Sequence, residues 1–109
     1  MSMKLVDTVA MAQVEAIDVE GRLWTDVHGN TFHSVYVSVL VKGETSYREL
    51  GHETFTYGYD SAYEQTAMQI MRECITGFNP TESALWRAAD ETGLKVNSRK
   101  ENVKRKKDM

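Results

Sequence analysis

The sequence has few of the residues that stabilise secreted proteins or separate domains. It has one cysteine, Cys74, so no disulfide can form within the chain, and this favours a reducing compartment such as the cytoplasm. It has one proline, Pro80, and no low-complexity linker, so we expect a single domain over residues 1–109. No run approaches the roughly 20 apolar residues that a membrane span requires. The N-terminus also lacks the charged-then-apolar pattern of a signal peptide.

Motifs of common enzyme classes are lacking as well. The sequence contains no GxSxG, no GxxxxGK[ST] and no GxGxxG. The histidines His28, His33 and His52 have no cysteine or carboxylate at a spacing typical of metal ligands, so no metal site is predicted. Cys74 falls on the buried stripe of a predicted helix, where a thiol behaves as a small hydrophobe. We therefore predict a protein that is not an enzyme and needs no cofactor.

The net charge of −3 hides an uneven distribution along the chain. Residues 95–109 carry seven basic and two acidic side chains, a net charge of +5, which leaves −8 for residues 1–94. Basic blocks of this kind often contact anions. A solvated, frayed terminus would have the same composition, so the charge pattern alone leaves both interpretations open.

The first half of the chain has the pattern of an antiparallel β-meander. We expect a turn at Glu20-Gly21 and a hairpin turn at 28–30, where the residues tolerate positive φ. Gly51 interrupts the last strand, and we expect a β-bulge there. The four predicted strands cover residues 12–20, 22–27, 31–41 and 46–57.

The third predicted strand has two different faces. Its valines at alternate positions from 35 to 41 share one face, which we expect to form the core, with His33 near the end of the same face. The other face carries Phe32, Tyr36 and Leu40, and it is too apolar to contact water alone. This second face is a candidate for a subunit contact or a ligand wall.

The second half of the chain is predicted to be helical. Ser61 begins a capping box, and Gly77 is expected to end this first helix. Asn79-Pro80 is a second start signal, and Gly93 is expected to end the second helix. A short strand over 94–96 then precedes the basic tail. Two helices packed on one face of an antiparallel sheet predict an α+β fold.

Features suited to binding are more prominent than features suited to catalysis. Tyr57, Tyr59 and Tyr63 lie around the start of the first helix, and aromatic rings of this kind stack on nucleobases, although Tyr63 is expected to turn back into the core. Both predicted helix N-termini offer backbone N–H groups to an anion. Arg99 and the basic run at 104–107 carry charges that bind phosphates. Each feature alone is more often structural, but together they favour a nucleotide or nucleic-acid ligand.

Three blocks of the sequence resemble small phage-encoded proteins. The blocks are "GNTFHSVYV" at 29–37, "FTYGYDSAYEQTA" at 55–67 and "VKRKKDM" at 103–109. Through them the chain is similar to the type 1 Thoeris anti-defence proteins. Those proteins are sponges that bind the cyclic ADP-ribose signals made by bacterial TIR-domain enzymes and so keep the downstream effector silent.

The resemblance implies that a cyclic nucleotide is captured without hydrolysis in the host cytoplasm, by a homo-oligomer built from dimers. It also implies that C-terminal arginines and an aromatic residue hold the ligand. Arg105 and Lys104 lie within the third block, Arg105 in the part that matches most closely, and Arg99 lies nearby. Because a mobile tail loses affinity to ordering entropy, we expect the tail to be ordered against a neighbouring subunit or the helix pair. The candidate aromatic residues, chosen for their chemistry, are Phe55, Tyr57 and Tyr59.

Other functions fit parts of the same pattern. One is a phage inhibitor that acts by protein–protein contact on a host nucleic-acid defence machine, as an anti-CRISPR protein or nucleic-acid mimic does. The acidic body suits mimicry and argues against direct binding to a duplex. A second is a structural protein that assembles through the face of Phe32, Tyr36 and Leu40. A small nucleotide-degrading enzyme is a third.

Overall fold

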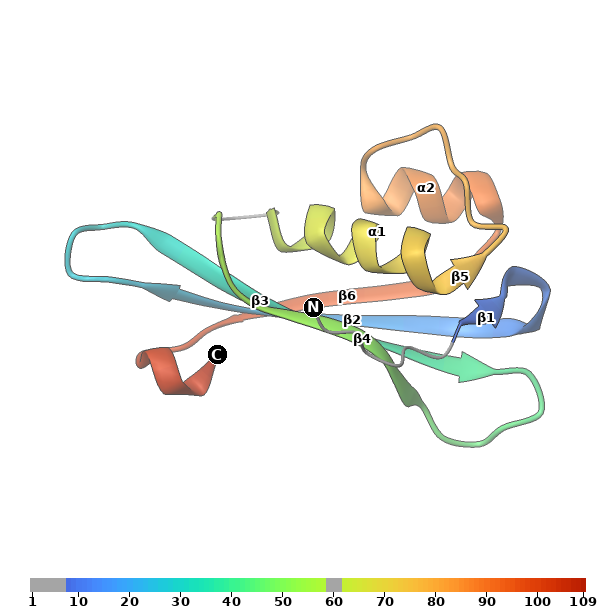
Figure 1. The fold of residues 1–109 in the computed structure, drawn as a ribbon, viewed down its shortest axis with the longest axis horizontal. Coiled ribbons are helices and arrows are strands. Elements are labelled where there is room, and N and C mark those ends of the chain that lie inside the picture. Colours follow the sequence, from blue (N-terminus) through green and yellow to red (C-terminus); the bar gives the residue numbers. More distant parts are fainter. Residues whose placement is uncertain (1–7, 59–61) are drawn as a thin grey trace.

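The protein is built around one four-stranded sheet. A computed structural model describes residues 8–58 and 62–109, and its strands follow the order β4-β3-β2-β6. β2–β3 and β3–β4 are antiparallel, whereas β6 runs parallel to β2. Two helices, α1 (Ala62–Cys74) and α2 (Leu85–Thr92), lie on the same face of this sheet (Figure 1). The predicted α+β class is therefore confirmed. The strands are β2 (Val14–Thr25), β3 (Thr31–Val41), β4 (Arg48–Tyr57) and β6 (Val96–Asn102).

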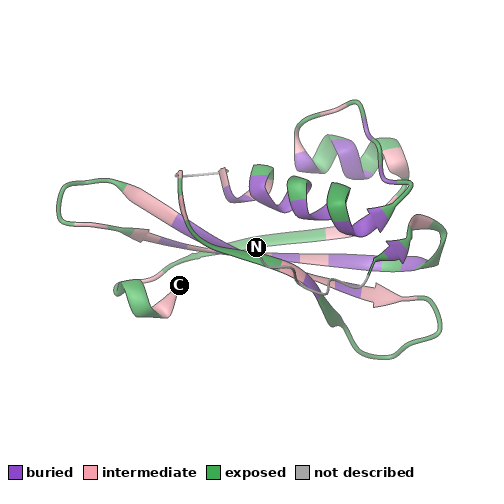
Figure 2. Cartoon of the chain, in the orientation of Figure 1, coloured by how far each residue is buried: buried purple, intermediate pink, exposed green. Residues whose placement is uncertain are grey.

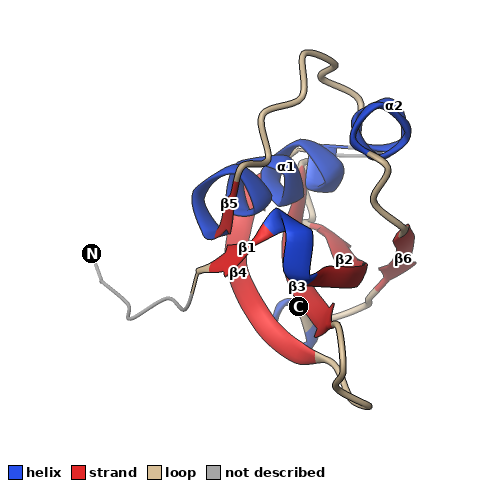
Figure 3. Cartoon of the chain, turned by 90° about the vertical axis from the view of Figure 1, so that its right-hand side faces the viewer, coloured by secondary structure: helices blue, strands red, loops and turns tan. Residues whose placement is uncertain are grey.

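A second, smaller sheet has two strands and lies where α1 ends. β1 (Val9–Ala10) pairs in parallel with β5 (Ile75–Thr76), which follows α1 directly, so α1 ends at Cys74 before the predicted stop at Gly77. Figure 3 shows this small sheet beside the main one, below α1. None of the helices in the described part of the chain is long and apolar enough to cross a membrane.

The core lies between the main sheet and α1, as the burial colours show (Figure 2). The valines of β3 at positions 35, 37 and 39 are almost completely buried, which confirms the predicted core face. His33 belongs to the same face and is 1% exposed. Its Nε2 lies 2.9 Å from Thr66 Oγ1 and its Nδ1 lies 3.2 Å from the Gly58 carbonyl oxygen. These contacts satisfy the polar ring inside the core.

The predicted turn at Glu20-Gly21 is wrong. β2 continues through Gly21 and pairs with β3 along nearly its whole length. Gly21 is buried, and a Cβ atom at this position would lie 2.4 Å from Cδ2 of Tyr63. The glycine therefore makes room for an aromatic ring from α1 instead of reversing the chain. As a result the antiparallel part of the sheet has three strands, and the fourth strand is β6.

Local turn signals predicted the other irregularities of the sheet well. At the β2–β3 hairpin the Asp26 carboxylate accepts the backbone N–H of Asn30 and that of His28, and these bonds, the Asn30 bond foremost, lower the pKa of Asp26. The bulge predicted at Gly51 is confirmed, because the β3–β4 register shifts beside it. A Cβ at Gly51 would approach Ile70 to 2.9 Å, so α1 packs closely over the bulge.

The predicted start of the second helix at Asn79-Pro80 is wrong as well. α2 begins at Leu85, and the preceding residues form an irregular loop. The carboxylate of Glu91 accepts the backbone N–H of Thr81 at 3.0 Å and that of Glu82 at 3.1 Å, which draws the loop back onto α2. The predicted end at Gly93 is confirmed, since this residue has φ +77 and caps the helix.

Replacing Glu91 with glutamine is expected to destabilise the protein at neutral pH and to have little effect in acid. The N–H bonds from Thr81 and Glu82 lower the pKa of Glu91 below its ordinary value of 4.5. A carboxyl with a lowered folded-state pKa adds stability above its unfolded pKa and loses it as the pH falls through the folded value. Urea unfolding of both proteins across this range tests the prediction. Asp90→Asn removes the same charge one residue earlier and should not reproduce the pH dependence.

The basic tail follows a different course from the one predicted. Residues 96–102 form β6 at the edge of the sheet, where only a short strand over 94–96 was expected. The following C-terminal segment, residues 103–109, lies below the sheet in Figure 1, on the face opposite to the helices. We call this the outer face. The tail thus packs on the outer face of its own sheet and not against the helix pair.

Candidate functional site

Four aromatic rings gather on the outer face near the β2–β3 hairpin, and we call them the aromatic shelf. Phe32 and Phe55 stack with ring centroids 4.6 Å apart and planes at 13°. Trp24 lies 6.1 Å from Phe32, and Tyr57 meets Phe32 edge-on at 5.5 Å. Phe55 remains 44% exposed and Tyr57 64% exposed. These rings offer exposed surface at which a flat, apolar or π-rich group can stack.

The backbone of Phe55 is strained. Its φ is +54, the one positive value for a non-glycine residue in the described ranges 8–58 and 62–109. The residue lies in a second bulge of β4, between the pairs His33–Thr56 and Val35–Glu53, and its N–H donates to Ser34 Oγ at 3.3 Å. A conformation of this kind costs about 1–3 kcal/mol and persists where the surroundings hold it, often at binding sites. Here it places the ring flat on Phe32.

The C-terminal segment is attached to the outer face by main-chain contacts. Val103 N–H donates to the Leu23 carbonyl at 2.8 Å, which extends the β6 pairing by one residue. Further on, the Tyr36 hydroxyl donates to the main-chain oxygen of Met109 at 2.7 Å. Arg22 Nη1 donates to the Asp108 carbonyl at 3.4 Å. The segment is therefore held at both of its ends while its middle residues stay exposed.

An open groove of about 830 Å³ runs along this segment. Its volume falls in the range of about 300–1,000 Å³ that is usual for small-ligand sites. Four of its side chains are cationic and two are carboxylates, so its net charge is positive. Such a lining suits an anionic ligand that brings phosphate oxygens to arginine. The lining residues are Arg22, Glu101, Asn102, Val103, Lys104, Arg105, Lys107 and Asp108.

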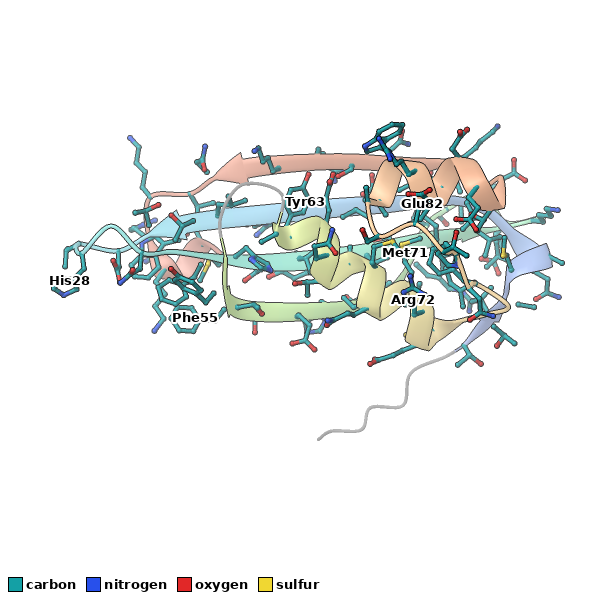
Figure 4. The ribbon with its side chains drawn as sticks, turned by 90° about the horizontal axis from the view of Figure 1, so that it is seen from above. His28, Phe55, Tyr63, Met71, Arg72 and Glu82 are labelled. Carbon is teal, nitrogen blue, oxygen red and sulfur yellow. The ribbon has the colours of Figure 1, made fainter. Side chains whose placement is uncertain are left out.

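Two residues in the middle of the segment connect the groove with the shelf. Arg105 lies in the groove, its side chain 65% exposed, and its Nε donates to Asp108 Oδ2 at 3.3 Å. The next residue, Lys106, turns the other way and places its Nζ 4.3 Å from the centroid of the Phe55 ring. Adjacent residues of one segment therefore reach the cationic groove and the aromatic shelf. Figure 4 labels Phe55 at the hairpin end of the molecule, where His28 lies, far from Arg72 and Glu82.

Arg99 lies outside the groove lining. Its guanidinium donates to Asp18 Oδ1 at 2.6 Å and contacts Glu20 Oε1 at 3.3 Å. The hydrogen bond with Asp18, followed by its charge, raises the pKa of Arg99 further. Glu20 in turn accepts a bond from Arg22 Nε at 3.2 Å. Arg99 thus belongs to a row of ion pairs across β6 and β2, and its charge is already balanced by two carboxylates.

The structure brings together only some of the remaining predicted site residues. Lys104, Arg105, Phe55 and Tyr57 come together at the groove and the shelf. Tyr59 and the proposed cap Ser61 lie outside the described residues. The anion site expected at the second helix N-terminus is absent from its predicted place among the described residues, because the N–H groups of that loop bond to Glu91.

Sequence reasoning missed Arg22 and Trp24 as site residues, although a signal was present. Asp18, Glu20, Arg22 and Trp24 alternate with apolar residues over one uninterrupted strand, which places all four on the outer face. The predicted turn at Gly21 divided this strand and concealed the alternation. The position of Lys106 over Phe55 depends on the fold of the tail, and no local pattern indicates it.

No protein-family model, curated protein or solved structure matches this chain. Function must therefore be judged from the site itself. Within residues 8–58 and 62–109, no group of three or more His, Cys, Asp or Glu side chains is placed to hold a metal ion. The arrangement at the outer face is suited to stacking a flat ring and binding a neighbouring anion.

Proposed function

We propose that this protein binds and sequesters a cyclic ADP-ribose-type nucleotide signal without hydrolysing it, as a phage anti-defence protein. The observation that carries the proposal is that two adjacent residues connect the two features: Arg105 lines the cationic groove, and Lys106 lies over Phe55 of the aromatic shelf. A nucleotide with an adenine ring and two phosphates needs a stacking surface beside cationic donors. The resemblance in the blocks at 29–37, 55–67 and 103–109 points to the same class of ligand.

The dimensions and chemistry of the site agree with capture. The groove of about 830 Å³ can take a ligand of dinucleotide size. Arg22 and Arg105 supply guanidinium groups that match phosphate oxygens in a fork geometry. A sponge removes one ligand molecule per site and does not turn over. Its dissociation constant must therefore be roughly nanomolar, which corresponds to a binding free energy of about −12 kcal/mol. Contacts from a preorganised shelf and an already ordered tail reduce the entropy lost on binding and so favour such an affinity.

The proposal is tested by depletion and release of a cyclic ADP-ribose. Excess purified protein should remove the nucleotide from an ultrafiltrate, and heating the complex should return it with unchanged mass and chromatographic retention. Recovery of linear ADP-ribose would indicate an enzyme. If the filtrate is not depleted, the proposal is wrong, and the alternative of protein contact with a host nucleic-acid defence machine would gain support. Cyclic nucleotide heated without protein serves as the control for chemical decay.

A further inference from the structure

Lys106 occupies a surface that a ligand would need. Phe32 covers one face of the Phe55 ring at 4.6 Å, and the Lys106 ammonium lies over the ring at 4.3 Å from its centroid. Since parallel stacking uses the first face, the ammonium takes the second. Both distances lie within the usual ranges for stacking and for a cation–π contact. The Lys106 ammonium therefore lies over part of the Phe55 ring, which remains 44% exposed.

We infer that Lys106 makes this site select nucleotides over nucleosides. The inference rests on the proposed function only in taking the Phe55 ring as the surface on which a nucleobase stacks. A base that stacks there must displace the ammonium from the ring. A nucleoside offers the displaced charge no new partner, so it binds less tightly than the bare ring would allow. A nucleotide brings a phosphate, and this can receive the ammonium at the edge of the groove.

The position of Lys106 in the chain makes this exchange feasible. Its neighbours Arg105 and Lys107 both line the groove, so a phosphate held there lies one residue away along the segment. The residue is exposed, and its long stem can carry the ammonium from the ring toward the groove without moving the backbone. The same side chain therefore opposes a neutral base and favours one that carries phosphate.

Replacing Lys106 should shift the two kinds of ligand in opposite directions. With Lys106→Ala, the dissociation constant for adenosine should fall about two- to fivefold, because an exposed cation–π contact no longer competes with the base. The dissociation constant for ADP should rise, because one phosphate contact is lost, so the ratio of the two constants changes about tenfold. NMR titration of the full chain with adenosine and with ADP measures both.

Two further variants separate this effect from a loss of structure. Lys106→Met keeps the stem without the charge and should behave as Lys106→Ala does. Lys107→Ala removes a groove cation with no contact to the ring, so it should weaken ADP binding and leave adenosine binding unchanged. The inference is overturned if both Lys106 variants shift adenosine and ADP in the same direction, if adenosine affinity does not rise, or if neither ligand binds. If the Lys106 variants change the selectivity but the wild type does not deplete cyclic ADP-ribose, this inference is supported and the proposed function is wrong.

Discussion

Replacing Arg22 and Arg105 together with alanine is expected to lower the affinity for a cyclic ADP-ribose at least about a hundredfold. Both guanidinium groups line the groove, one from β2 and the other from the C-terminal segment. A hydrogen bond to a charged group contributes about 1.5–3 kcal/mol, and every 1.4 kcal/mol is about tenfold in affinity. Each single variant should therefore cost about tenfold or more. Isothermal titration calorimetry with the intact protein measures all three variants.

Arg99→Ala is the matched control for this experiment. Arg99 is the same residue type on the same outer face, but Asp18 and Glu20 bind its guanidinium and it does not line the groove. Its loss should change ligand affinity by no more than about twofold, since exposed ion pairs contribute little. An equal loss of affinity in Arg99→Ala, or full affinity in the double variant, would show that the groove is not the site.

A second control concerns the structural part that Arg22 plays. Its Nη1 bonds to the Asp108 carbonyl, and its guanidinium lies 5.2 Å from the centroid of the Tyr36 ring, so it also helps to hold the C-terminal segment. Arg22→Lys keeps the charge but loses the fork geometry. If charge alone matters, this variant should bind nearly as well as the wild type. If positioning of the segment matters, it should resemble Arg22→Ala.

The sequence was informative where a structural feature depends on neighbouring residues. The alternation of β3 identified its core face, the hairpin turn at 28–30 follows from residues that accept positive φ, and Gly93 ends α2 by the same property. These features need only a few consecutive positions. The bulge at Gly51 belongs with them, because a glycine in the middle of a strand is itself the signal.

The features that sequence did not reveal depend on contacts between distant residues. Gly21 meets Tyr63 from α1, and Glu91 bonds to Thr81 ten residues earlier. The length of β6 depends on its pairing with β2, which lies almost eighty residues before it. Its polar sequence carries no strand pattern of its own, because six of its seven residues are exposed at the sheet edge.

The same distinction applies to the candidate site. The sequence identified Phe55, Tyr57 and the tail cations by their chemistry and by a resemblance. Neither criterion predicts how these side chains are arranged in space. Phe55 reaches Phe32 through a bulge with positive φ, a conformation that a sequence does not predict for phenylalanine. The approach of Lys106 to that ring requires the tail to cross the outer face. Site membership was therefore partly predictable, whereas site geometry was not.

Gly21→Ala is expected to destabilise the fold by about 3 kcal/mol, the upper end of the usual cost of overpacking. The new Cβ would lie 2.4 Å from Tyr63 Cδ2 and 2.5 Å from its Cγ. The ring has little freedom to move away, because it is 5% exposed and its hydroxyl lies 2.8 Å from Ser98 Oγ. Urea unfolding, with the midpoint and slope compared to the wild type, measures the change.

A double-variant cycle shows whether Tyr63 is the cause. Tyr63→Ala alone should cost about 3–5 kcal/mol, the range for truncating a buried aromatic residue. In the double variant the alanine methyl enters the space that the ring has left, so the combined cost should be smaller than the sum by about 2 kcal/mol. Gly29→Ala is the control: Gly29 has φ +85 and open space around it, so its cost of about 1–2 kcal/mol should add to that of Tyr63→Ala. If the costs of Gly21→Ala and Tyr63→Ala also add, the glycine is needed for its backbone conformation, as in a turn, and not to make room for the Tyr63 ring.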